Sequence, residues 1–217
     1  MVGMSIRAVI MDLDGTLVDS NDAHARAWVA ALRDFGIERT FEDVRPLIGM
    51  GGDQLLPRVA DVDPNSERGE GLTQAWAEHF KPMIPELRAT RGARELLEAL
   101  HGRGLRVILG TSGDSDVIDP LLEHIGVRDL VPDRVTADDV EASKPEPDIL
   151  HAALQKLGVG AHEALMVGDT PFDAEAAKRA NVRVALLRAG GDERVNAEAF
   201  TFDDPADLAA HLDDVLR

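Results

Sequence analysis

Residues 8–20 read AVIMDLDGTLVDS, and this stretch decides the fold expected for the whole chain. Four apolar residues lead into two aspartates and a glycine turn, a pattern typical of a buried strand that ends at polar residues. Residues two apart on a strand point the same way, so Asp12 and Asp14 are expected to face one space. Two ionised carboxylates so near each other repel, and this arrangement is unfavourable unless a cation or a shared proton lies between them. A plain polar turn has the same residues, so the rest of the chain must decide.

Length and composition bound the architecture and the partners. With 217 residues, 44% of them hydrophobic, the chain suits one large domain or a core domain with a smaller insertion. The formal net charge of −17 argues against a nucleic-acid groove or an anionic membrane surface as the main partner. An anionic substrate would therefore need a local cation. Because the chain has no cysteine, disulfides, thiolate zinc sites and cysteine nucleophiles are excluded.

Nothing in the sequence indicates export or membrane insertion. Residues 1–7 lack an apolar secretion region, and no apolar stretch is long enough to span a bilayer. We therefore expect a cytoplasmic enzyme with no membrane partner.

A block of helices follows the first strand, which is expected at residues 8–11. Apolar residues recur at helical spacing, and nothing between residues 20 and 83 has the pattern of a strand. The chain therefore predicts a helical insertion directly after strand one. Its helices are expected at residues 24–35, 41–48, 54–59 and 70–81.

Strands and helices alternate in the remainder of the chain. This alternation predicts an α/β fold with a parallel sheet, right-handed crossovers and helices on both faces. Ligands of such sheets bind beyond the carboxyl ends of the strands. Strands are expected at residues 105–111, 131–135, 164–168 and 182–187, and helices at residues 92–103, 115–125, 147–157, 171–180 and 207–216.

Polar side chains stand at those strand ends. Thr111, followed by Ser112, ends the second strand, and Asp169 ends a later one with Asp173 in the next turn. Lys144 lies in a loop between two elements. Each of these residues falls on the sheet edge where the fold predicts a ligand.

This set of residues predicts a magnesium and phosphate site. Mg²⁺ prefers oxygen ligands, and Asp12 and Asp169 are the natural direct ligands, with Asp173 close behind. Thr111 adds a hydroxyl and Lys144 a positive charge, while backbone N–H groups at the turns also point inward. The local field is then positive although the protein is acidic.

An aspartate beside a phosphate can act covalently and form an aspartyl phosphate. Asp12 is the candidate nucleophile. Asp14 could protonate the leaving oxygen and then deprotonate water. Lys144 would offset charge on the transferring phosphoryl group.

These residues resemble the motifs of the haloacid dehalogenase superfamily, in its phosphatase branch. Residues 12–16 (DLDGT) match the first motif, Thr111 the second, Lys144 the third, and residues 168–173 the fourth. The likeness runs in order from residue 8 to about 188, and is greatest to members similar to phosphoglycolate phosphatase and β-phosphoglucomutase. It implies a Rossmann-like three-layer core, a magnesium cofactor and a small all-helical cap.

The resemblance also implies residue roles. Asp12 would be the nucleophile and Asp14 the acid/base, with the main-chain carbonyl of Asp14 as a third metal ligand beside Asp12 and Asp169. Thr111, Ser112 and Lys144 would bind the substrate phosphate. The supporting residues would be Asp173, Thr16 and His24.

Two alternatives to a phosphatase remain open. One is a phosphosugar mutase of the β-phosphoglucomutase type, because His24 matches a mutase histidine near the cap hinge. The loop at residues 49–53 (GMGGD) lacks the arginine that such a mutase uses for a second phosphate, which disfavours that alternative. The other is a non-catalytic phosphate sensor similar to a signalling receiver, although receivers lack an inserted cap.

We expect two domains, a catalytic core of residues 1–16 and 88–217 and a cap of residues 17–87. The cap would open to admit a small phosphorylated metabolite and close to exclude water. Within it, Trp28 and Trp76 are expected in the cap core and not as a substrate platform. Arg58, His79 and Lys81 are expected on solvated helix faces.

Overall fold

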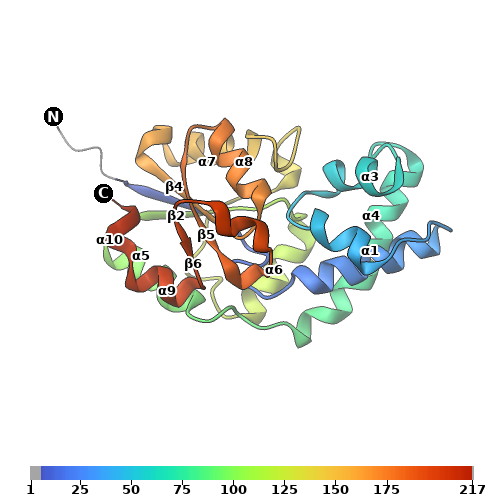
Figure 1. The fold of residues 1–217 in the computed structure, drawn as a ribbon, viewed down its shortest axis with the longest axis horizontal. Helices are drawn as coiled ribbons and strands as arrows, with labels where there is room; N and C mark the ends of the chain where they lie inside the picture. The colour runs from blue at the N-terminus through green and yellow to red at the C-terminus, as the bar shows by residue number, and fades with distance from the viewer. Residues whose placement is uncertain (1–5, 217) are drawn as a thin grey trace.

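The sheet lies at one end of the molecule and is parallel throughout. A computed structural model describes residues 6–216, so residues 1–5 and Arg217 of the expected core, with most of the N-terminal segment, lie outside the described residues. The six strands follow the order β3-β2-β1-β4-β5-β6 (Figure 1). The strands are β1 (Ala8–Met11), β2 (Arg106–Gly110), β3 (Arg134–Val135), β4 (Ala164–Gly168), β5 (Arg183–Leu187) and β6 (Thr201–Phe202).

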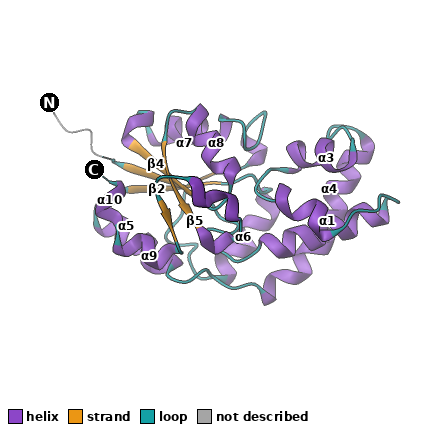
Figure 2. Cartoon of the chain, viewed as in Figure 1, coloured by secondary structure: helices purple, strands orange, loops and turns teal. Residues whose placement is uncertain are grey.

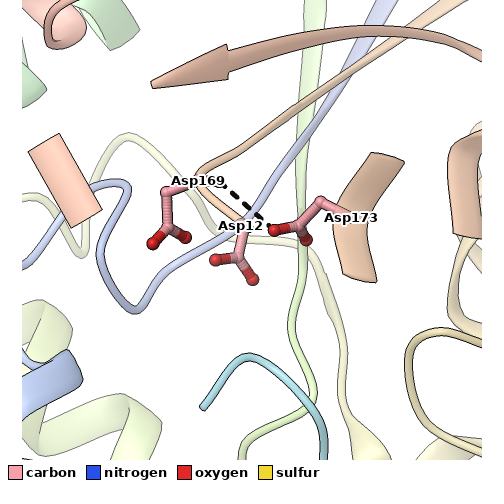
Figure 3. A group of neighbouring side chains, drawn as sticks. All are labelled: Asp12, Asp169 and Asp173. Carbon is pink, nitrogen blue, oxygen red and sulfur yellow. Dashed lines mark hydrogen bonds between the residues drawn. The ribbon is translucent and has the colours of Figure 1, made fainter. Parts of the chain in front are cut away.

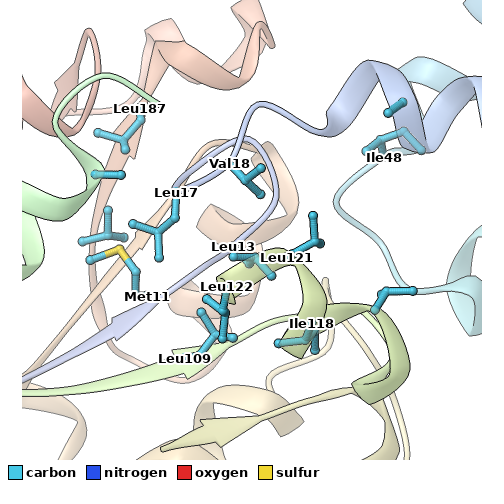
Figure 4. Close-up of a cluster of buried hydrophobic side chains, with 14 of the residues drawn as sticks. Met11, Leu13, Leu17, Val18, Ile48, Leu109, Ile118, Leu121, Leu122 and Leu187 are labelled. Atoms are coloured by element: carbon cyan, nitrogen blue, oxygen red, sulfur yellow. The ribbon is translucent and has the colours of Figure 1, made fainter. Parts of the chain in front are cut away.

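Helices cover both faces of the sheet, as alternating strand and helix patterns predict. Ala8 and Ile10 of β1 pack in the hydrophobic cluster that includes α7 and α8. Val9 and Met11, which point the other way, pack in the cluster that includes α5, α6 and α9. Figure 4 shows Met11 with other members of this cluster. The core is therefore three layers deep. Its helices are α5 (Ala93–Gly102), α6 (Ser115–His124), α7 (Asp148–Leu157), α8 (Pro171–Arg179), α9 (Pro205–Ala210) and α10 (Leu212–Val215), with short 3-10 turns η3 (Ala137–Asp139), η4 (Ala161–Glu163), η5 (Arg188–Gly190) and η6 (Glu193–Ala197).

A second, all-helical part separates β1 from α5 and forms its own lobe beside the sheet (Figure 2). We call its elements, α1 to η2, the helical insertion. Helix α1 packs along α4, and their facing residues, Trp28, Leu32, Leu72 and Trp76, are buried. The insertion consists of α1 (Asn21–Asp34), α2 (Phe41–Val44), η1 (Arg45–Leu47), α3 (Gly52–Ala60), α4 (Glu67–Phe80) and η2 (Lys81–Glu86).

The structure differs from the expected elements in three places. The strand expected at residues 131–135 is confined to Arg134–Val135, because Pro132 has no N–H to donate to a ladder. The helix expected at 207–216 is two helices that meet at His211, whose φ of −119° and ψ of 21° are not helical. Strand β6 has only two residues, too few for a periodic pattern.

No helix within residues 6–216 combines the length and the apolar character needed to cross a membrane.

Candidate active site

Three buried aspartates meet where β1 and β4 end. Asp12 follows β1, Asp169 follows β4, and Asp173 lies in the first turn of α8, with one carboxylate oxygen of each within 4.8 Å of the others (Figure 3). The register sets this meeting, since Met11 lies opposite Val167 and the Asp12 N–H donates to Val167 O at 2.9 Å. The neighbouring strand ends thus bring together residues that are far apart in the sequence.

Lys144 lies inside this group. Its Nζ lies 2.5 Å from Asp12 Oδ1 and 2.8 Å from Asp173 Oδ1, and the side chain is 1% exposed. Burial opposes the charged form, but Asp12 and Asp173 outweigh it and raise the pKa of Lys144 above its usual range. The lysine expected at a phosphate site is therefore a fixed ammonium against the candidate nucleophile.

One ammonium does not balance three carboxylates. Burial, opposed by Lys144 and reinforced by Asp173, raises the pKa of Asp12 to about 7. Burial, with Asp173 and Asp12, also raises the pKa of Asp169 well above its usual range. The negative charge that Lys144 leaves unbalanced favours a further cation, and carboxylate oxygens are the ligands that Mg²⁺ prefers.

Hydrogen bonds distinguish the three carboxylates as possible metal ligands. Asp173 Oδ2 caps α8 by accepting from the N–H groups of Asp169 and Thr170 and from the Thr170 hydroxyl, while Oδ1 accepts from Lys144. Asp12 Oδ2 has only the Thr16 hydroxyl at 3.5 Å, and Asp169 Oδ1 has the same hydroxyl at 3.3 Å. Asp12 and Asp169 therefore have the coordination capacity, and Asp173 holds the neighbouring groups in place.

The carboxylate of Asp169 is held by residues that sequence reasoning missed. Asn21 Nδ2 donates to Asp169 Oδ2 at 2.7 Å and to Gly190 O at 3.0 Å. A Cβ at Gly15 or Gly190 would lie 2.1 Å or 1.7 Å from Asp169 Oδ2, so both positions require glycine. The DLDGT motif includes Gly15 and so indicates a role for it, but no local sequence pattern indicates that Asn21 or Gly190 contacts Asp169.

Asp14 lines the same cavity as Asp12, and its carboxylate bonds to residues at the start of the helical insertion. Its Oδ1 accepts from Ser20 Oγ at 2.5 Å and lies 2.7 Å from His24 Nε2. Burial favours the neutral acid, but His24 and Ser20 outweigh it and lower the pKa of Asp14. We expected Asp14 to be free to carry a proton, and in this arrangement it is an ionised hydrogen-bond acceptor.

A stack of aromatic rings positions His24. Its ring lies 3.9 Å from the Phe80 ring at an interplanar angle of 11°, and the stack continues through Trp76 to Trp28. Both tryptophans are nearly buried, as expected of core residues, yet both also line the main cavity. Helices α1 and α4 thus fix the direction from which His24 reaches Asp14.

The residues after β2 close the site on another side. Thr111 is 1% exposed, and its Oγ1 accepts from Gly113 N–H at 3.0 Å. Ser112 Oγ accepts from the Lys144 N–H at 3.3 Å, which joins this loop to the lysine loop. Thr111 and Ser112 both line the cavity beside Asp12.

The cavity, of about 250 Å³, lies between the helical insertion and the sheet edge. The loop at residues 49–53 forms part of its wall, so this loop reaches over the site and is more than a turn between helices. Asp53 Oδ2 accepts from Ser143 N–H at 3.0 Å. Arg45 donates to Gly190 O at 2.5 Å. These contacts hold the insertion against the core.

The three basic residues singled out in the insertion lie outside the cavity wall. Arg58 donates to Gln54 O at 2.7 Å, as expected of a helix face. His79 pairs with Asp34 at 2.7 Å, and Lys81 with Asp116 at 3.7 Å. Each therefore has an acceptor elsewhere.

Comparisons with known proteins agree with this geometry. The Haloacid dehalogenase-like hydrolase family model matches residues 9–187. A phosphoglycolate phosphatase of Rhodospirillum rubrum is 34% identical over 219 residues, which cover 95% of this chain and 90% of that protein. Protein SUPPRESSOR OF QUENCHING 1, chloroplastic, of Arabidopsis thaliana is 31% identical over 89% of this chain but only 19% of its own length. The structure of a hydrolase from Pseudomonas syringae aligns with a TM-score of 0.90 at 32% identity and covers 97% of this chain and 99% of that chain.

Proposed function

The chain belongs to the haloacid dehalogenase-like hydrolases and is a phosphatase, and on this basis we propose that it hydrolyses a small phosphorylated metabolite through a phosphoryl group on Asp12. The superfamily resemblance that the four motifs carry is thereby confirmed. The observation that supports the mechanism is the buried contact of Lys144 with Asp12 beside two further carboxylates. A cytoplasmic location stays a prediction.

Magnesium is the proposed cofactor. Asp12 and Asp169 would supply carboxylate ligands, Asp173 would support them, and the Asp14 main-chain carbonyl stays a predicted third ligand. The donor set fits, because three carboxylates face a single ammonium. When bound, Mg²⁺ would withdraw charge from the phosphate oxygens.

In the first half of the proposed reaction, a free oxygen of Asp12 attacks phosphorus while the bond from phosphorus to the leaving oxygen breaks. Lys144 orients Asp12 and offsets charge on the phosphoryl oxygens. The leaving oxygen takes a proton from the hydrogen-bonded pair of Asp14 and His24. Thr111 and Ser112 would hold the phosphate on the side of β2.

In the second half, water attacks the phosphoryl group and the bond between phosphorus and the Asp12 oxygen breaks. Asp14, with its lowered pKa, is suited to take the proton of that water. Inorganic phosphate leaves and Asp12 is regenerated. The pair of Asp14 and His24 thus returns to its starting protonation state.

We also propose that the helical insertion acts as the cap expected from the sequence, with the core at residues 1–16 and 88–217. The cavity lies between the two parts, and the polar contacts of Asp53 and Arg45 cross from one to the other. Opening would admit substrate, and closing would exclude bulk water.

The cavity favours a phosphatase over a mutase. A mutase of the β-phosphoglucomutase type handles a bisphosphate, which needs a cation for each phosphate group. No arginine or lysine of residues 6–216 lines the part of the cavity that faces the insertion. A screen that counts free phosphate and isomerised sugar phosphate, with and without Mg²⁺, tests this proposal. Free phosphate only with Mg²⁺ supports it, whereas isomerisation or a stable phosphoprotein without turnover contradicts it.

A further inference from the structure

Beyond Asp12 and Asp14, the wall of the cavity is acidic. Asp53 of the insertion and Asp114, Asp138 and Glu141 of the core all line it. Burial, reinforced by Asp138 and Asp116, raises the pKa of Asp114 to about 6. A leaving group that enters this space meets negative charge on both sides.

No basic side chain offsets that charge. Within residues 6–216, the cavity wall contains no lysine or arginine, and its one imidazole, His24, is committed to Asp14. Lys144 is buried between Asp12 and Asp173 at the phosphate end. A second anionic group on the substrate would therefore be repelled and left without a partner.

Two buried polar atoms of the wall have no hydrogen-bond partner within the described part of the chain. Trp76 Nε1 is a hydrogen-bond donor, and Trp76 as a whole is 4% exposed. Asp53 Oδ1 is an acceptor, while Oδ2 of the same residue holds the Ser143 N–H. Buried polar groups are rarely left unpaired, so we take each atom as a candidate partner for a ligand, Trp76 Nε1 for an acceptor and Asp53 Oδ1 for a donor. A hydroxyl has both capacities, whereas an ammonium only donates.

The same wall offers an apolar surface. Trp28 and Trp76 stack with ring centroids 5.5 Å apart, and both line the cavity with Ile48 and Met50. Carbon–hydrogen faces of a sugar or polyol pack on such surfaces while the hydroxyls reach the polar atoms.

We propose that the leaving group is an uncharged, hydroxyl-rich molecule, a sugar or polyol, and that substrates with a carboxylate or second phosphate are rejected. This inference rests on the proposed phosphatase function and adds the substrate class. It separates this chain from the activity named for its Rhodospirillum rubrum relative, because phosphoglycolate carries a carboxylate.

The first test compares phosphate release from a hexose monophosphate, glycerol phosphate, phosphoethanolamine and phosphoglycolate, all with Mg²⁺. Of the hexose monophosphate and glycerol phosphate, we expect the one with the higher kcat/KM to exceed phosphoglycolate in kcat/KM by at least about tenfold. Equal or better turnover of phosphoglycolate overturns the inference, and so does a preference for phosphoethanolamine. p-Nitrophenyl phosphate is the reference, and no release from any substrate contradicts the proposed function itself.

The second test removes one charge from the wall. In Glu141→Gln, the ratio of kcat/KM for phosphoglycolate to that for the hexose monophosphate should rise about fivefold. Glu123→Gln changes the net charge equally on the exposed face of α6, outside the cavity wall, and should leave the ratio unchanged. An unchanged ratio in Glu141→Gln, or an equal rise in both variants, contradicts the inference.

The third test concerns the indole N–H. Trp76→Phe keeps an aromatic ring in the stack but removes Nε1. Because Trp76 also stacks on His24, p-nitrophenyl phosphate reports any displacement of that histidine, and we expect kcat/KM for the hexose monophosphate to fall about fivefold more than that for p-nitrophenyl phosphate. A proportional fall for both substrates would indicate a merely structural effect and contradict the assigned contact.

Discussion

At the scale of single residues, the site is built on an unbalanced set of buried charges. Asp12, Asp169 and Asp173 share one ammonium, so the carboxylates repel one another when no further cation is near. Such repulsion costs stability in the folded state and would provide affinity for the proposed divalent cation. Stability and function therefore oppose each other at these positions.

Asp169→Asn tests that opposition. Because burial, Asp173 and Asp12 raise the pKa of Asp169, removing its charge should stabilise the metal-free protein. The variant should also lack the increase in melting temperature that we expect Mg²⁺ to give the wild type. Thermal unfolding with and without Mg²⁺ measures both effects. A variant that keeps the full magnesium-dependent increase would show that Asp169 is not a ligand.

Asp114 is expected to make stability depend on pH. Burial, with Asp138 and Asp116, raises its pKa from 3.8 to about 6. The folded state therefore binds the proton more tightly, and this contribution to stability is lost as pH rises from about 4 to about 6. Asp114→Asn should match the wild type near pH 4 and exceed it by about 1 kcal/mol above pH 6, after allowance for solvent screening. Urea unfolding across this range measures the difference, and a constant difference would contradict the expected titration.

At the scale of elements, the turn after β1 is under a steric constraint. Gly15 has a φ of 75°, and a Cβ there would lie 2.1 Å from Asp169 Oδ2. Gly126 has a similar φ of 71° but no atom within 4 Å of a Cβ. The two glycines therefore separate backbone strain from displacement of Asp169.

Gly15→Ala and Gly126→Ala make a matched pair. Both should lose about 1 kcal/mol of unfolding free energy because alanine is strained at positive φ, and Gly15→Ala should lose more because its Cβ would collide with Asp169. Only Gly15→Ala should also lower phosphatase activity, by about tenfold or more, since Asp169 must move. Urea unfolding and steady-state kinetics measure the two effects. Equal activity in both variants would mean that the turn does not position the aspartate.

Long periodic elements could be predicted from the sequence, and short ones could not. The residues of β1 and β4, the order of the elements and the meeting of Asp12 with Asp169 follow from buried strands in a parallel sheet. Strand β6, at two residues, has no period to detect. Asn21 and Gly190 reach Asp169 only through tertiary packing, so no local pattern marks them. The low pKa of Asp14 likewise depends on where α1 places His24.

At the scale of the whole molecule, the helical insertion and the core form the cavity together. Arg45 donates from η1 to Gly190 O across this boundary. Because Gly190 O also accepts from Asn21, the contact ends beside the support of Asp169. If the insertion closes as proposed, the Gly190 carbonyl would connect its closure to the order of the site.

Arg45→Ala should weaken the closed arrangement. The loss of a charged hydrogen bond predicts a fall of about five- to tenfold in kcat/KM for p-nitrophenyl phosphate. Arg39→Ala is the control, because Arg39 bonds to Val59 O and Glu38 O within the insertion. Steady-state kinetics should show little change in the control. A normal kcat/KM in Arg45→Ala would mean that this contact does not stabilise closure.

The whole account depends on Asp12 as the nucleophile. The most direct measurement is phosphate release by Asp12→Asn from p-nitrophenyl phosphate at saturating Mg²⁺, with circular dichroism to verify the fold. An amide cannot form the acyl phosphate, so we predict turnover below about one-thousandth of the wild type in a protein that stays folded. Turnover near the wild-type rate would contradict the account.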